Sequence, residues 1–264
     1  MKFLLTLASL VAAVPASAAV RSGHATAEWV ASSSTYQPSK PLVTAIRLSL
    51  DPGWHTYWVN PGESGMKPGI QWTLPAGWTA GPVGWPVPVR FETGGLAGFG
   101  YIGEVLLPVT LTPPADASGP VMLEAKVNWL TCNDDACVPG EGALKLELKP
   151  GEPVTTAFEP MVAKVAAALP KPVEGLSLEV KEDGKKLGLT LRSPAGTDPT
   201  AFEVFPVTKQ VLDSAAPIHF AKSGETWSVS APKSEYLEGE AESLELVLTG
   251  GGLPHPATVV WQKK

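Results

Sequence analysis

Short runs in which hydrophobic and polar residues alternate dominate the sequence, and glycine and proline separate them. The alternation is clearest at 42–50, 105–111, 121–130 and 143–149. A period of two residues is typical of strands that bury one face. Many short strands of this kind, separated by turns, predict an all-β chain built as a β-sandwich.

The pattern changes near residue 150, where a proline-rich joint begins. A single helix-like segment follows at 158–170 and ends at Pro170. Strand patterns then resume with a hairpin over 176–193 that turns at Asp183-Gly184. The sequence therefore predicts two sandwiches joined by a linker with one helix. The predicted boundaries are 1–18 for a leader, 19–152 for the first sandwich, 153–170 for the linker and 171–264 for a smaller second sandwich.

The first eighteen residues have the pattern of a secretory signal peptide. Lys2 precedes a short apolar run, and small residues stand at Ala16 and Ala18. We expect cleavage after Ala18; the alternative is a buried N-terminal helix. No later segment has the roughly 20 continuous apolar residues that a membrane span requires. We therefore expect an exported chain without a membrane span, periplasmic in location, in a compartment where disulfides persist.

The charge pattern makes nucleic acid and anionic membrane surfaces poor candidates for partners. The formal net charge is −6, and no cluster of lysine and arginine occurs. Tryptophan is distributed unevenly, because seven of the nine tryptophans lie between Trp29 and Trp129. We therefore expect the functional site in the first half of the chain.

Cys132 and Cys137 are the only cysteines, and they lie in the stretch VNWLTCNDDACVPG. A structural disulfide here would close only a six-residue loop and restrain the unfolded chain by about 2 kcal/mol. A local pair of this kind is also suited to reversible opening and closing. A metal site would need two further ligands, and the four histidines show no paired spacing. The residues alone leave structural, redox and metal-binding interpretations open.

Two acidic residues, Asp134 and Asp135, separate the cysteines. Negative charge disfavours ionisation of a nearby thiol, so these thiols are expected to be slow nucleophiles. Such a pair is better suited to be attacked as a disulfide than to attack, and a partner would complete its activation.

A second group of candidate residues lies in DPGWHTYWVNPGESG, residues 51–65. Side chains alternate along a strand, so His55 and Tyr57 are expected to share one face. Both can form hydrogen bonds or handle a proton near a sulfur site. The alternative is a pair of half-buried residues in an ordinary sheet.

The glycine-rich stretch RFETGGLAGFGY, residues 90–101, carries Phe91, Phe99 and Tyr101. It lacks the strand-to-helix setting and the Lys-Ser/Thr ending of a phosphate-binding loop. A mobile loop with aromatic residues can cover a reactive group as a lid. A glycine-rich turn with its aromatic residues packed inward is the alternative.

These motifs, in this order along residues 25–150, resemble the N-terminal periplasmic domain of the thiol:disulfide interchange protein DsbD family. The resemblance includes the branch represented by suppressor-of-copper-sensitivity protein B. Residues 158–264, with FEVFPV and APIHFAKSG, also look like the second β domain of that branch. The resemblance implies an immunoglobulin-like domain and a role in thiol-disulfide exchange, electron transfer and cytochrome c biogenesis.

The resemblance also implies roles for individual residues. Cys132 and Cys137 would be the redox pair, and Phe91 would be the aromatic residue of a cap loop. Phe99 and Tyr101 are further cap and pocket candidates. Tyrosines that flank the pair in some family members fall on His55 and Tyr57, and His55 is a departure from that pattern. The implied partners are a thioredoxin-like or DsbD-type membrane electron donor and periplasmic disulfide-bearing proteins, without a cofactor or metal.

Full-length family members continue into a membrane domain and a thioredoxin-like domain with its own C-x-x-C. Neither is found before Lys264. We therefore expect either a freestanding shuttle that a separate protein reduces or a chain that has lost its redox role. Whether the chain is an enzyme of the oxidoreductase class stays open. The competing hypothesis is an exported binding module for protein or carbohydrate, with exposed tryptophans and a structural disulfide.

Overall fold

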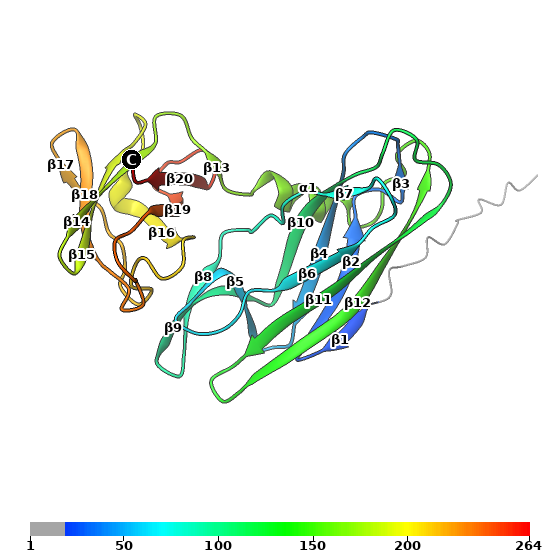
Figure 1. Ribbon diagram of the computed structural model, residues 1–264, viewed down its shortest axis with the longest axis horizontal. Coiled ribbons are helices and arrows are strands. Elements are labelled where there is room, and N and C mark those ends of the chain that lie inside the picture. The colour runs from blue at the N-terminus through cyan, green and yellow to red at the C-terminus, as the bar shows by residue number, and fades with distance from the viewer. Residues whose placement is uncertain (1–18) are drawn as a thin grey trace, which may run out of the picture.

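The computed structural model describes residues 19–264 (Figure 1). The predicted signal peptide, residues 1–18, lies outside the described residues. The described chain forms four sheets in two β-sandwiches, with one α-helix between them. The all-β fold class predicted from the sequence is confirmed, while the predicted domain boundaries stay a prediction.

The first sandwich consists of two sheets that pack face to face. The first sheet has the strand order β1 (Val20–Ser22), β2 (Ala25–Ala31), β4 (Leu42–Leu50), β10 (Glu104–Thr112) and β7 (Thr79–Ala80). The second sheet has the order β3 (Thr35–Tyr36), β12 (Cys137–Pro150), β11 (Val121–Cys132), β5 (His55–Gly62), β9 (Leu96–Ile102) and β8 (Val89–Thr93), and β6 (Gly69–Thr73) also pairs with β11.

The alternating runs of the sequence are the strands that build this core. The run at 42–50 is β4, and those at 105–111, 121–130 and 143–149 lie in β10, β11 and β12. Along β11 and β12, buried and exposed side chains alternate, as expected for strands with one face toward the opposite sheet. The largest side chains of the core include Trp29, Trp58 and Trp129, all fully buried. This packing makes the second sheet a rigid platform for its loops and edges.

The linker helix α1 (Glu159–Ala167) covers the outer face of the first sheet. Its buried Val162 packs in a cluster with Val30, Ala45 and Leu106. The helix is shorter than the predicted 158–170, because its last backbone hydrogen bond runs from the Ala168 amide to the Lys164 carbonyl and Pro170 follows. The helix therefore ties the linker to the first sandwich.

The second sandwich has two four-stranded sheets. One has the order β13 (Lys171–Pro172), β20 (Ala257–Gln262), β19 (Ser243–Gly250) and β16 (Phe202–Pro206), and the other β14 (Ser177–Asp183), β15 (Lys186–Arg192), β18 (Thr226–Pro232) and β17 (Ala221–Ser223), with a short 3-10 helix at Pro199–Ala201. The predicted hairpin over 176–193 is β14–β15, and its turn follows Asp183. Phe205 and Val247 of this sandwich belong to the core cluster of the first, so the two sandwiches share apolar contacts.

Candidate functional site

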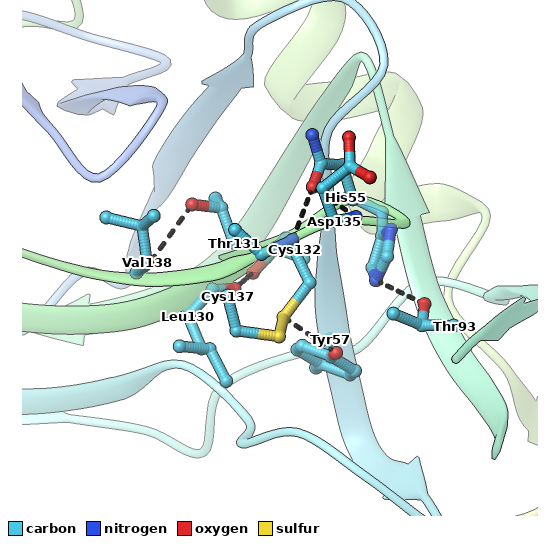
Figure 2. The surroundings of a disulfide bond; sticks show 12 residues. His55, Tyr57, Thr93, Leu130, Thr131, Cys132, Asp135, Cys137 and Val138 are labelled. Atoms are coloured by element: carbon cyan, nitrogen blue, oxygen red, sulfur yellow. Dashed lines mark hydrogen bonds between the residues drawn. A yellow bond between two sulfur atoms is a disulfide. The ribbon is translucent and has the colours of Figure 1, made fainter. Parts of the chain in front are cut away.

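The two cysteines close the end of the longest hairpin of the chain. Strands β11 and β12 pair in continuous register from Val121 opposite Leu148 to Cys132 opposite Cys137. The Cα atoms of the two cysteines are 4.1 Å apart, and their sulfurs form a disulfide (Figure 2). Directly opposite positions on antiparallel strands bring side chains close enough for this bond.

A tight turn connects the cysteines. The Asn133 amide donates to the Ala136 carbonyl over 3.0 Å, and the Asn133 Oδ1 accepts from the amides of Asp135 and Ala136. Asp134 and Asp135 are exposed on this turn. The predicted acidic insert therefore places its charge on the solvent side of the disulfide.

The two cysteines differ strongly in burial. Cys132 has an exposed fraction of 0%, whereas Cys137 is exposed. Cys132 is buried because β5 pairs beside it, with His55 opposite Cys132. Cys137 lies at the start of β12, where exposed turn residues precede it. The disulfide therefore presents one cysteine to solvent and keeps the other in the protein interior.

Strand β5 places His55 and Tyr57 on the disulfide side of the sheet. The Tyr57 hydroxyl lies 3.0 Å from the Cys132 Sγ, within the hydrogen-bonding range for sulfur (Figure 2). Between them, Thr56 points to the other face and its hydroxyl donates to the Leu130 carbonyl. The alternation expected from the sequence thus places both aromatic side chains near the sulfur atoms.

Phe91 lies against these two rings from the neighbouring hairpin of β8 and β9, which we call the cap hairpin (Val89–Ile102). The ring centroids of Phe91 and His55 are 4.0 Å apart, and those of Phe91 and Tyr57 are 5.7 Å apart. Gly98 is opposite Phe91 in the register, and a Cβ at Gly98 would lie 2.3 Å from the Phe91 ring. The glycine therefore leaves room for the phenyl ring to lie flat across β9.

The cap hairpin also provides a polar contact. The Thr93 Oγ1 lies 3.2 Å from the His55 Nε2 (Figure 2). His55, with 8% of its surface exposed, is therefore enclosed by Phe91 on one side and Thr93 on another. His55, Tyr57 and Phe91 form a site cluster beside Cys132.

Phe99 and Tyr101 lie outside this cluster, contrary to their placement in the cap and pocket. Phe99 has an exposed fraction of 0% and packs edge-on against Trp58 in the core. The Tyr101 hydroxyl donates to the Pro86 carbonyl. Alternation along β9 explains the difference, because Gly98 faces Phe91 and the next residue must face the other way. For these two residues, inward packing, the alternative interpretation of the glycine-rich stretch, is what the structure shows.

Burial sets the protonation of the site cluster. Burial raises the pKa of Tyr57 above its usual value, so the phenol is neutral at neutral pH and can donate a hydrogen bond. Burial lowers the pKa of His55, and the negative charge of Asp134 opposes part of this effect. At neutral pH the cluster therefore carries no charge of its own.

The free energy of unfolding should fall as the pH decreases below about 6.5 because of His55. The pKa of this histidine lies below its ordinary value of 6.5 in the folded chain, so the unfolded chain binds more protons there in acid. Replacing His55 by glutamine should flatten the profile below about pH 6.5 in urea denaturation series. Equal slopes for the wild type and the variant would contradict this expectation.

Two other features are absent from the described residues, a metal-ligand cluster and a membrane-spanning helix. Residues 19–264 hold no group of three or more His, Cys, Asp or Glu side chains that could bind a metal ion. Within the same range, no helix has the length and apolar character needed to cross a membrane.

Comparison with protein families identifies the first sandwich. The family model described as "Thiol:disulfide interchange protein DsbD, N-terminal" matches residues 26–149. Residues 26–149 therefore form a domain of the DsbD N-terminal family. The matched segment contains the disulfide and the whole site cluster. A search of curated protein sequences found no match.

One solved structure has the same fold as this chain. It is the N-terminal periplasmic domain of ScsB from Proteus mirabilis, with 24% identity and a TM-score of 0.66, covering 90% of this chain and 93% of that one. At this identity the likeness shows the fold alone. A second match, the YadV chaperone, has 13% identity and a TM-score of 0.23, too low to carry an argument.

Sequence reasoning missed several residues around the site of this DsbD N-terminal domain. Thr93, two residues after Phe91 on the same strand, contacts His55. Arg90 and Asn60 bond to the second sandwich through carbonyls more than one hundred residues away. The only basic residue of the stretch at 90–101 was the available signal for Arg90, but no local pattern indicates its partner.

Proposed function

We propose that this chain is a periplasmic thiol-disulfide exchange protein that works through Cys132 and Cys137. It would take electrons from a thioredoxin-like or DsbD-type membrane donor and pass them to periplasmic disulfide-bearing proteins. The observation that carries the proposal is the unequal burial of the two cysteines. Cys137 is exposed, whereas Cys132 is buried and accepts a hydrogen bond from the Tyr57 hydroxyl. The match of residues 26–149 to the DsbD N-terminal family model supports it, and the fold is that of a periplasmic domain of ScsB.

The geometry favours attack at Cys137. A thiolate of the donor attacks the Cys137 Sγ, and a mixed disulfide forms between the donor and Cys137. The Cys132–Cys137 bond breaks, and its electron pair leaves on the Cys132 Sγ as a thiolate. The Tyr57 hydroxyl, already 3.0 Å from this sulfur, donates a hydrogen bond to the new negative charge.

The second cysteine thiolate of the donor then attacks the donor sulfur that is bonded to Cys137 in the mixed disulfide. The donor leaves with a disulfide, Cys137 leaves as a thiolate, and the two cysteines take up two protons. The chain has gained two electrons, and the donor has lost two. Passing them to a periplasmic disulfide reverses the sequence, with the Cys137 thiolate as the attacking group.

The surroundings of the pair would keep it inactive between partners. Phe91 and His55 exclude water on the Cys132 side, which makes release of a thiolate costly until the site opens. The exposed charges of Asp134 and Asp135 disfavour ionisation of the Cys137 thiol in the reduced state. A docked partner of suitable charge would relieve the second effect.

The competing hypothesis of a binding module depended on exposed tryptophans. None of the nine tryptophans is exposed, and Trp29, Trp58 and Trp129 are fully buried. Trp78 is buried as well and the other five are only partly exposed, so no tryptophan presents a full ring face for stacking.

The proposal is tested by equilibrating the folded chain with a thioredoxin-like protein that carries a C-x-x-C motif. We expect reversible exchange and a reduction potential close to that of such redox partners, well above the roughly −300 mV typical of structural disulfides. Circular dichroism of the reduced form would show whether the fold persists. A disulfide that is reduced only when the chain unfolds would refute the proposal.

A further inference from the structure

Strand β16 of the second sandwich accepts hydrogen bonds from β5 and β8, the two strands that carry the site cluster. The Arg90 Nη2 of β8 donates to the Val204 carbonyl of β16 over 2.7 Å. The Asn60 Nδ2 of β5 donates to the Pro206 carbonyl of the same strand, also over 2.7 Å. Between these bonds, the Phe205 ring packs against Trp58 and enters the core of the first sandwich. In Figure 1 the cap hairpin lies on the side of the first sandwich that faces the second.

Arg90 makes the most extensive of these contacts. Its guanidinium lies 4.8 Å from the Phe99 ring centroid and 5.4 Å from that of Phe205. Its Nη1 donates to the Ser214 carbonyl over 3.2 Å. A guanidinium that packs against two adjoining aromatic rings and donates to two backbone carbonyls is strongly restricted in position.

The position of Arg90 in the strand links this contact to the site. Arg90 and Phe91 are neighbours in β8, so their side chains point to opposite sides. Arg90 points to the second sandwich, and Phe91 points to His55 and Tyr57. Because β8 is an edge strand that pairs only with β9 among the described strands, its own sheet holds it from one side alone. Contact with β16 supplies the second attachment.

We propose that Arg90 is a positioning residue through which the second sandwich holds Phe91 against the site, and so controls how readily the Cys132–Cys137 disulfide exchanges. This inference rests on the proposed exchange function. It gives the second sandwich a task of its own, which is to hold the cap hairpin closed.

The direction of the effect follows from the burial of Cys132. When Phe91 is held in place, the departing Cys132 thiolate forms in a poorly hydrated environment, which disfavours it. When β8 is released, water reaches this side and the thiolate leaves more readily. Loss of Arg90 should therefore accelerate reduction of the disulfide.

The test is a double-mutant cycle on the full chain, with dithiothreitol as the small thiol. We expect Arg90→Ala to speed reduction about threefold to tenfold, as when a leaving thiol becomes moderately more acidic. Phe91→Ala should speed it at least as much. The double variant should match Phe91→Ala, because Arg90 acts through Phe91. Arg90→Lys, which retains one charged donor, should fall between Arg90→Ala and the wild type.

Arg47→Ala is the matched control. Arg47 bonds to Glu28 and Glu104 on strands of the other sheet, so its loss removes charged hydrogen bonds without touching the cap hairpin. Its reduction rate should equal that of the wild type. An unchanged rate in Arg90→Ala, or accelerations that multiply in the double variant, would overturn the inference.

Amide hydrogen exchange provides a readout that does not depend on redox activity. Arg90→Ala should speed exchange in β8 and β9, whereas Arg47→Ala should leave these amides as in the wild type. Unchanged protection in Arg90→Ala would overturn the attachment itself. A wild-type disulfide reduced only on unfolding would overturn the proposed function and the role of Arg90 in exchange, while hydrogen exchange would still decide whether Arg90 holds the hairpin.

Discussion

Replacing Cys132 by serine should give a folded chain whose Cys137 thiolate attacks a disulfide partner, keeps one partner sulfur in a mixed disulfide and releases the other as a thiolate, whereas replacing Cys137 by serine should abolish reaction with the partner. In the first variant, the exposed Cys137 keeps its access to solvent, and no second sulfur is present to release the partner. In the second variant, the remaining thiol belongs to Cys132, whose exposed fraction is 0%. A buried thiol reacts only when the structure opens locally.

The difference is measured as the rate of reaction with an aromatic disulfide reagent, followed by mass spectrometry of the adduct. We expect the Cys137 thiol to react at least about 100-fold faster than the Cys132 thiol, because only the latter requires local opening. The double serine variant is the control for non-specific labelling. Loss of the bond costs about 2 kcal/mol in either single variant, so their thermal stabilities should agree. Equal labelling rates at equal stability would contradict attack at Cys137.

Gly100→Ala should destabilise the first sandwich by about 3 kcal/mol or more, at the upper end for overpacking in a well-packed interior. Gly100 lies opposite Tyr57 where β9 pairs with β5, and a Cβ there would lie 1.9 Å from the Thr56 carbonyl oxygen. The clash is with backbone, so no side-chain rotation can relieve it. The strands must separate, which moves the cap hairpin, and Phe91 with it, away from His55 and Tyr57.

Gly188→Ala is the matched control, because Gly188 is also a strand glycine. A Cβ at Gly188 would lie 3.7 Å from its nearest neighbour, the Lys181 carbonyl oxygen, an ordinary contact. Its effect should stay within about 0.5 kcal/mol. Urea unfolding measures both variants, and alkylation of reduced protein should show faster modification of Cys132 in Gly100→Ala. Similar unfolding free energies for the two variants would show that β5 and β9 are not packed as closely as described.

The strands and the local pairing of the cysteines could be predicted from the sequence because both depend on short-range periodicity. Alternation in β4 and β11 reports which face is buried, and that face is the same in any sandwich that contains the strand. The shared face of His55 and Tyr57 follows from the same rule. The predicted helix was real but too long, since apolar pattern alone does not locate the last hydrogen bond of a helix.

The sequence by itself thus determined the strands, the hairpin-like proximity of Cys132 and Cys137 and the aromatic pair on β5. Only the tertiary structure decided which cysteine is buried, because that depends on β5 pairing beside Cys132. It also decided that Phe91, and not Phe99, faces the site, since this depends on the register of the cap hairpin against β5. The hold of β16 on Arg90 joins residues 114 positions apart. Contacts at that separation come from the packing of two sandwiches, and a local pattern of residues cannot predict them.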